Sequence, residues 1–119
     1  MALRFPKSAR LYRAAEFARL RNEGRSVHGK FMVLRLLRSS DVTPTRIGIV
    51  TSRRVGGAVF RNRVRRRLRE LVRVDRPRLA PNFWLVLIAR PYAVEAKFHA
   101  LREEWRALAK SGGVLDDEP

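Results

Sequence analysis

Hydrophobic and polar residues follow different periods along this chain. In residues 14–22, Phe17 and Arg21 fall on one face at helical spacing, and Gly24 follows as a stop signal, which predicts a helix. Residues 27–37 are rich in Val, Phe and Leu and predict a strand. The first third of the chain is therefore expected to form one helix and one strand.

The rest of the chain continues this alternation of elements. Residues 39–45 are typical of a turn, and residues 46–52 predict a second strand, which ends before a pair of glycines. Residues 58–74 then predict a long helix. The uninterrupted apolar run 83–89 predicts a fully buried strand, and residues 94–109 carry apolar side chains at helical spacing that predict a last helix.

The order of these elements (helix, strands, helix, strand, helix) indicates an α+β or α/β layer, with helices against one small sheet. A chain of 119 residues has room for one domain with one core, and no internal repeat or linker divides it. We therefore expect one domain over residues 1–110, followed by a flexible acidic tail over residues 111–119.

Composition excludes several classes of protein. The chain has no cysteine, which excludes a disulfide framework and a thiolate metal site. Its longest apolar run is far shorter than the roughly 20 residues that span a bilayer. Its first residues lack the apolar stretch of a secretory signal. These features predict a compact, soluble, cytoplasmic protein without a membrane partner.

The charge of the chain indicates a polyanionic partner. Lys and Arg number 27 against 11 Asp and Glu, which gives a formal net charge of +16. Most of the basic residues are arginine, whose planar guanidinium group binds phosphate through two hydrogen bonds and stacks on bases. Such an excess destabilises the folded chain by self-repulsion, which a polyanion would relieve. Nucleic acid is the leading candidate.

The predicted helix 58–74 concentrates this charge. Its apolar positions form one stripe, expected to pack on the sheet: Phe60, Val64, Leu68, Leu71 and Val72. The opposite side carries Asn62, Arg66, Arg69 and Arg73, with Arg63 and Arg65 on its flanks. Several of these arginines are like charges four residues apart, and each such pair destabilises a helix by roughly 0.2–0.5 kcal/mol. A helix selected only for stability would not carry them, so we expect a nucleic-acid-binding surface that begins at Arg53 and Arg54.

The sequence around this helix resembles a family signature. Residues 51–70 are TSRRVGGAVFRNRVRRRLRE, and the bacterial ribonuclease P protein components carry a pattern like S-[KR]-[KR]-[VI]-G-x-A-V-x-R-N-R-[VI]-[KR]-R. The similarity extends over about residues 8–108 and includes Glu16-Phe17 before the motif and Ile88-Ala89-Arg90-Pro91 after it.

The resemblance implies an α-β-β-β-α-β-α sandwich with a left-handed βαβ crossover. It also implies the protein subunit of a ribonucleoprotein endoribonuclease that removes the 5′ leader from precursor tRNA. In that family the RNA subunit carries out the chemistry with Mg²⁺, while the small basic protein binds this RNA and the leader. No cofactor bound by the protein itself and no protein partner are expected.

The resemblance also implies two sets of site residues. The surface toward the catalytic RNA comprises Arg53, Arg54, Arg61, Asn62, Arg63, Arg65, Arg66 and Arg69. The leader-binding cleft, between the first helix and the sheet, comprises Phe17, Arg21, Phe31 and Arg35. Arg21 and Arg35 stand where aromatic residues are common in the family, and arginine can stack on bases as well as bind phosphate. Phe31 and Tyr12 are possible substitutes for those aromatic residues.

The chain shows no catalytic constellation of its own. His28 and His99 are its only histidines, and Glu103-Glu104 on the last predicted helix is interpreted as a solvated charge pair. Two other functions compete with a ribonuclease P subunit. One is a ribosomal or other structural RNA-binding protein, which only the motif argues against. The other is a DNA-binding protein with the basic helix in a major groove, which the missing helix-turn-helix spacing disfavours.

Overall fold

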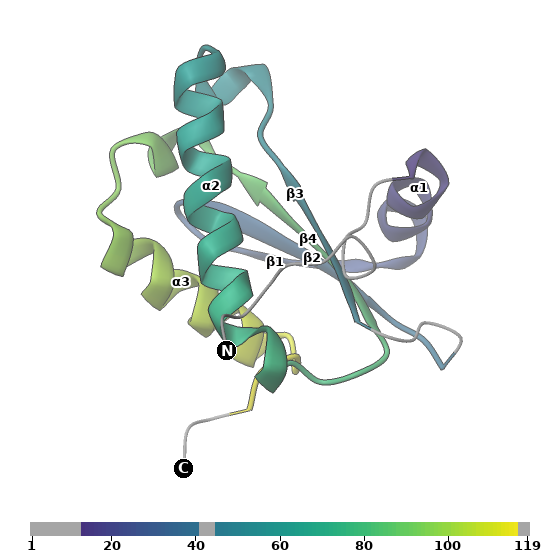
Figure 1. Cartoon of the computed structure of the whole chain (residues 1–119). Helices are drawn as coiled ribbons and strands as arrows, with labels where there is room; N and C mark the ends of the chain where they lie inside the picture. Colours follow the sequence, from purple (N-terminus) through teal and green to yellow (C-terminus); the bar gives the residue numbers. More distant parts are fainter. Residues whose placement is uncertain (1–12, 41–44, 117–119) are drawn as a thin grey trace.

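A computed structural model describes residues 13–40 and 45–116 and shows a four-stranded sheet with helices on both faces (Figure 1). The elements, in chain order, are α1 (Ala14–Glu23), β1 (Arg25–His28), β2 (Met32–Arg38), β3 (Arg46–Val50), the 3₁₀ turn η2 (Arg53–Val55), α2 (Ala58–Asp75), η3 (Arg76–Arg78), β4 (Phe83–Ala89), η4 (Pro91–Val94) and α3 (Phe98–Ser111). This confirms the expected α+β class and the order α-β-β-β-α-β-α.

The sheet has the strand order β1-β2-β4-β3. The strand β2 pairs antiparallel with both β1 and β4, and β3 pairs parallel with β4. The helix α2 therefore connects two parallel neighbours. The central strand β4 is the apolar run of the sequence, and it is mostly buried because helices cover both of its faces.

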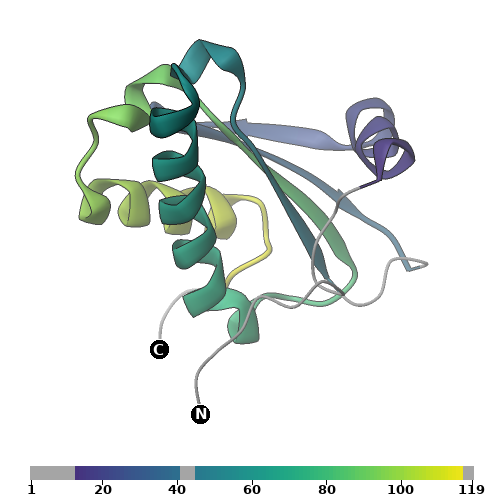
Figure 2. The same ribbon diagram turned by 45° about the horizontal axis from the view of Figure 1, so that its top comes forward.

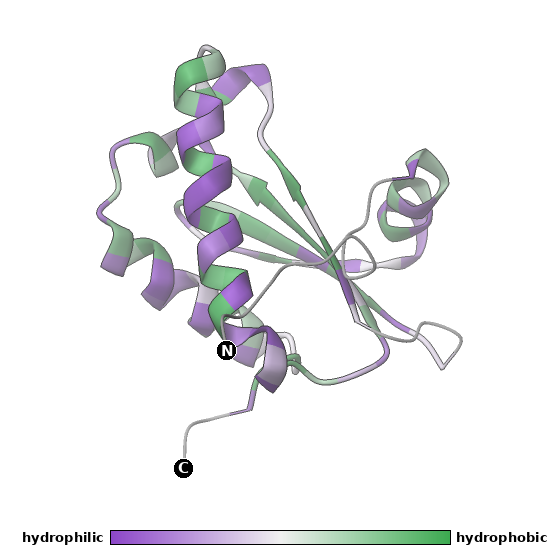
Figure 3. Ribbon diagram, in the orientation of Figure 1, coloured by the Kyte–Doolittle hydropathy of each residue, from purple (hydrophilic) through white to green (hydrophobic). Residues whose placement is uncertain are grey.

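The two faces of the sheet are covered unequally (Figure 2). The helices α2 and α3 pack on one face, where alternate residues of β2 and β4, such as Leu34 and Leu87, form the main core. The shorter α1 packs on the other face, where Leu20 meets Val86. Figure 3 shows the contrast along α2, whose outer side is hydrophilic while the strands beneath it are hydrophobic.

The strand expected over residues 27–37 is in fact two strands joined by a tight turn. The carboxylate of Glu104, on α3, accepts hydrogen bonds from the backbone N–H groups of Lys30, Phe31 and Met32 at 2.6, 2.8 and 3.0 Å. A Cβ on Gly29 would lie 2.4 Å from the Glu104 Cδ, so a larger residue at this position would displace the carboxylate from these hydrogen bonds. The interpretation of Glu104 as a solvated charge is therefore wrong: it fixes the β1–β2 turn onto α3.

A second buried acid joins α2 to α3. The side chain of Asp75 is almost fully buried at the end of α2. Its Oδ2 accepts hydrogen bonds from the Trp105 Nε1 at 2.8 Å and from the Arg106 Nε at 3.2 Å. A buried carboxylate is tolerated only when such partners replace its water, so this cluster fixes the angle between the two helices.

Three expectations are wrong: the start of the last helix, the burial of Phe60 and the start of the C-terminal tail. The last helix begins at Phe98, because η4 occupies the residues before it. Phe60 is 47% exposed and does not join the core, because the first turn of α2 lies beside η4 rather than on the sheet. The tail expected from residue 111 onward is packed on the domain as far as Leu115. Val114 and Leu115 are buried, and Leu115 forms a β-bridge with Leu79.

Candidate RNA interface and the α1 pocket

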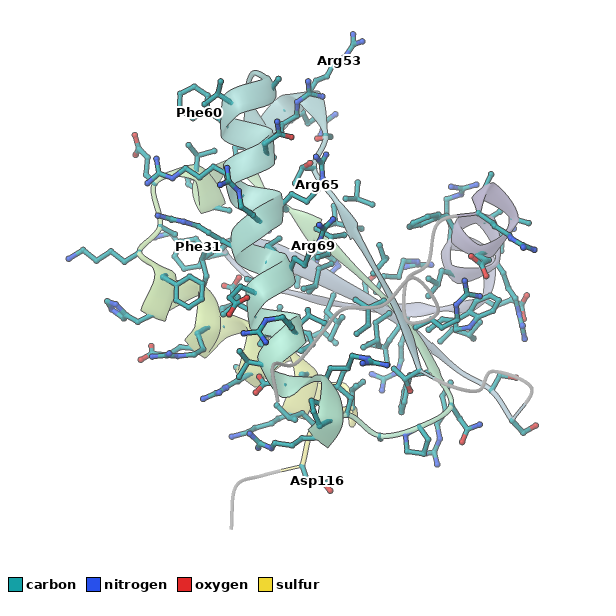
Figure 4. All side chains as sticks on the ribbon, in the orientation of Figure 1. Phe31, Arg53, Phe60, Arg65, Arg69 and Asp116 are labelled. Atoms are coloured by element: carbon teal, nitrogen blue, oxygen red, sulfur yellow. The ribbon has the colours of Figure 1, made fainter. Side chains whose placement is uncertain are left out.

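The arginines of α2 and η2 form a basic face, made of Arg53, Arg54, Arg63, Arg66 and Arg69. All five side chains are exposed. Figure 4 shows Arg69 along the outer part of α2 and Arg53 near its N-terminal end. Within the described residues, the guanidinium groups of Arg63, Arg66 and Arg69 have no hydrogen-bond or ion-pair partner. The fold therefore leaves these charges free for an external anion.

Three other residues of the expected RNA surface are more constrained. Arg65 donates to the Thr51 Oγ1 at 2.7 Å and to the Asn62 Oδ1 at 3.0 Å, so these contacts tie the end of β3 to α2. Arg61 is half-buried, and its Nε has no acceptor among the described residues. The structure thus brings all eight expected residues to one region. Five of them are exposed arginines whose guanidinium groups have no partner among the described residues, Arg65 and Asn62 are hydrogen-bonded to each other, and Arg61 is half-buried.

The electrostatics of α2 leave the basic face positive. Glu70 is its only acidic residue before Asp75, and its carboxylate accepts hydrogen bonds from the Arg73 Nε at 2.8 Å and Nη2 at 2.6 Å. The Arg73 guanidinium holds the pKa of Glu70 below its usual value through these hydrogen bonds. Glu70 is therefore ionised at neutral pH and paired with Arg73. Gly57, the N-cap residue, has no side chain to accept from the first turn.

A pocket of about 190 Å³, the α1 pocket, lies on the other face of the sheet. Its lining residues come from α1, β2, β3 and β4: Phe17, Leu20, Arg21, Arg35, Val50, Val86 and Ile88. Three of the four residues expected in the leader cleft therefore meet here. Phe17 is half-buried and Arg21 is exposed at the mouth of the pocket.

The Arg35 side chain is held by the protein itself. Its Nε donates to the Leu20 carbonyl at 2.9 Å, its Nη1 to the Ser26 Oγ at 2.6 Å, and its Nη2 to the carbonyls of Arg21 and Gly24. These carbonyls end α1, where the helix dipole favours a cation. Arg35 thus lines the α1 pocket, and its guanidinium group also holds the C-terminal end of α1 against β2.

Phe31 is not part of the α1 pocket, and its expected place in the leader cleft is wrong. It packs against the main core on the side of α2 and α3, as Figure 4 shows. It precedes β2 in the turn fixed by Glu104, so the alternation that turns Val33 and Arg35 toward α1 does not extend to it. Tyr12, the other substitute, lies outside the described residues.

Residues 13–40 and 45–116 offer neither a metal site nor a membrane-spanning helix. No group of three or more His, Asp or Glu side chains in these ranges is placed to hold a metal ion. No helix there is long and apolar enough to cross a membrane. The geometry described above is that of an exposed basic surface and a small mixed pocket on opposite faces of one sheet.

Comparisons with known proteins agree with this geometry. The family model Ribonuclease P matches residues 5–112. The chain is 38% identical to the ribonuclease P protein component of Symbiobacterium thermophilum over 94% of this chain and 97% of that protein. It is 40% identical to that of Chloroflexus aurantiacus, over 92% and 81%.

Solved structures give the same result. The RNase P protein of Staphylococcus aureus superposes with a TM-score of 0.83 at 25% identity, covering 92% of this chain and all of that one. The protein from Thermotoga maritima superposes with a TM-score of 0.76 at 27% identity, over 86% and 96%. The chain therefore belongs to the family of bacterial ribonuclease P protein components, subunits of the endoribonuclease that processes the 5′ ends of tRNA.

Proposed function

We propose that the basic face binds the RNA subunit of ribonuclease P and that the α1 pocket binds the 5′ leader of precursor tRNA. The observation that carries the proposal is the set of free guanidinium groups on α2, Arg63, Arg66 and Arg69. Like charges on successive turns destabilise the free helix, and phosphates of a bound RNA relieve that repulsion.

The α1 pocket supports the second half of the proposal. It combines an aromatic ring, Phe17, with an exposed guanidinium group, Arg21, above an apolar floor of strand residues. An unpaired base can stack on the ring while its phosphate meets the arginine. The pocket lies across the sheet from the basic face, so one protein can contact two RNA molecules at once.

Among residues 13–40 and 45–116, neither surface holds an acid–base pair, and the RNA subunit carries out the chemistry. Mg²⁺ belongs to the RNA-catalysed reaction, and no metal is assigned to the protein. The protein contributes binding energy and neutralises phosphate repulsion between the RNA subunit and its substrate.

Reconstitution tests the assignment of the basic face. Bacterial ribonuclease P RNA and precursor tRNA are mixed with the protein at low Mg²⁺, and single-site 5′ cleavage is expected to increase. The variant Arg66→Ala/Arg69→Ala is expected to bind the RNA subunit more weakly. It is also expected to flatten the slope of log K against log salt by about 1.5, since each lost phosphate contact contributes roughly 0.7–0.9.

The matched control removes two exposed charges elsewhere, Lys30→Ala/Arg38→Ala. Both variants lower the net charge by two, so a general loss of charge predicts equal effects. Equal salt slopes for the two variants, with normal folding of both, would exclude the basic face as the site that binds the RNA subunit.

A further inference from the structure

A hollow of about 570 Å³ lies between α2 and α3. Its lining residues are Arg63, Arg66, Arg67, Glu70 and Phe98, and we call it the α2–α3 pocket. The volume lies within the range of about 300–1,000 Å³ that is typical of pockets for small organic ligands. This lining combines three arginines, which can bind a phosphate, with one aromatic ring, which can stack on a base.

The charges of the α2–α3 pocket are available to a ligand. Arg63 and Arg66 have no partner among the described residues. Arg67 is oriented by a hydrogen bond of 2.9 Å from its Nη1 to the Ala96 carbonyl. Glu70 is the only acid in the lining, and its two oxygens accept from Arg73, outside the pocket. The pocket therefore keeps a net positive charge that no described residue neutralises.

Phe98 supplies the aromatic surface of the α2–α3 pocket. It is the first residue of α3 and is 36% exposed, although apolar residues of α2, such as Leu71 and Val74, lie beside it. The first turn of α3 has no acidic residue and no side-chain cap, so its N–H groups add to the positive potential at the ring. An exposed ring beside free guanidinium groups is the arrangement that binds unpaired bases.

We infer that the α2–α3 pocket binds one unpaired nucleotide of the RNA subunit, with the base against Phe98 and its phosphate between Arg63 and Arg66. This inference rests on the proposed function of the basic face, with which the pocket shares these two arginines. The source is the RNA subunit rather than the leader, because the α1 pocket lies on the opposite face of the sheet. A second copy of this chain does not fit, since a net charge of +16 on each copy opposes association.

Two substitutions of Phe98 separate stacking from packing. Phe98→Leu keeps an apolar side chain against α2 but removes the ring, and Phe98→Trp keeps an aromatic surface. Because Phe98→Leu removes the ring that stacks on the base, this variant is expected to bind the RNA subunit about 5- to 10-fold more weakly. Phe98→Trp is expected to bind within about twofold of the original protein, and thermal unfolding confirms that both variants fold.

A matched control uses Tyr92, an aromatic residue that is 62% exposed and lies outside the α2–α3 pocket. Tyr92→Leu is expected to leave the affinity unchanged. Chemical probing of the RNA subunit in the reconstituted complex then identifies the nucleotide. One unpaired base is expected to be protected with the original protein and with Phe98→Trp, and reactive with Phe98→Leu.

The outcomes distinguish this inference from the proposed function. If Arg66→Ala/Arg69→Ala weakens binding while Phe98→Leu does not, the inference is wrong and the basic face stands. If the Phe98-dependent protection falls on the leader of precursor tRNA, the RNA subunit is excluded as the source. If the arginine double variant binds as the original protein does, the proposed function itself fails.

Discussion

Two pairs of arginines, one on each face of the sheet, differ in what the fold gives them to bind. On the α1 face, Arg35 donates to carbonyls at the end of α1, and Arg46 pairs with the buried carboxylate of Glu16. On the α2 face, Arg66 and Arg69 are exposed and have no partner among the described residues. One set completes the fold, and the other leaves its hydrogen-bond donors to a ligand.

The position along each helix reinforces this difference. The guanidinium group of Arg35, which belongs to β2, reaches the C-terminal end of α1, where the helix dipole stabilises a cation. Arg61 and Arg63 instead lie in the first turns of α2, where the dipole disfavours a cation. The comparison teaches that arginine content alone does not locate an RNA site. Burial and the supply of acceptors from the protein decide which guanidinium groups are available.

The stability of the α2 layer is expected to come from its buried side rather than from its arginines. Asp75→Ala leaves the Trp105 N–H and the Arg106 guanidinium without their acceptor. Removal of one member of a buried charged cluster costs about 3–5 kcal/mol of unfolding free energy. Urea unfolding measures this loss. As a control, Glu70→Ala removes an exposed acid from the same helix and is expected to change stability far less.

The substitution Arg35→Ala tests whether this arginine on the α1 face stabilises the fold. Loss of its charged hydrogen bonds is expected to cost about 1.5–3 kcal/mol. The damage should be local, so amide hydrogen exchange is expected to accelerate in α1 while α2 stays protected. Arg21→Ala, in the same pocket but exposed, is expected to leave exchange in α1 nearly unchanged. Unchanged protection of α1 in Arg35→Ala would remove the structural role assigned to this arginine.

Phe17 tests whether the α1 face also binds RNA. If its ring stacks on a leader base, Phe17→Ala weakens precursor tRNA binding by roughly 1–3 kcal/mol, while mature tRNA, which lacks the leader, binds as before. Because Phe17 also packs beside Leu20 and Val86, Phe17→Leu is included to keep that packing. A loss of thermal stability with an unchanged ratio of precursor to mature affinity would assign Phe17 to the core alone.

The smallest expected effect has the opposite sign. Arg69 lies one turn after Arg65, and removal of this like-charge pair is expected to stabilise the free protein by about 0.2–0.5 kcal/mol. Salt screens such repulsion, so the gain of Arg69→Ala should vanish as ionic strength rises. Thermal unfolding at low and high salt measures it. Destabilisation by Arg69→Ala at low salt would mean that Arg69 serves the fold, as Arg35 does.

The sequence alone determined the parts of this protein that depend on local pattern. The stripe of Val64, Leu68 and Leu71 predicted the buried side of α2, and the arginines between them predicted its basic face. The motif around Asn62 identified the family. Helical periodicity and a linear motif are properties of one segment, and no distant contact is needed to produce them.

Only the tertiary structure decided which residues hold one another. Arg35 bonds to a carbonyl 15 residues before it, and Glu104 fixes Phe31 from 73 residues away. The first contact gives Arg35, an expected leader-binding residue, a structural role in holding α1 to β2. The second divides one expected strand into two and keeps Phe31 out of the α1 pocket. The sequence does not distinguish an arginine or glutamate that is bonded within the fold from one that is exposed and unbonded. The role of each side chain depends on where the fold places hydrogen-bond donors and acceptors, and local periodicity in the sequence does not predict these positions.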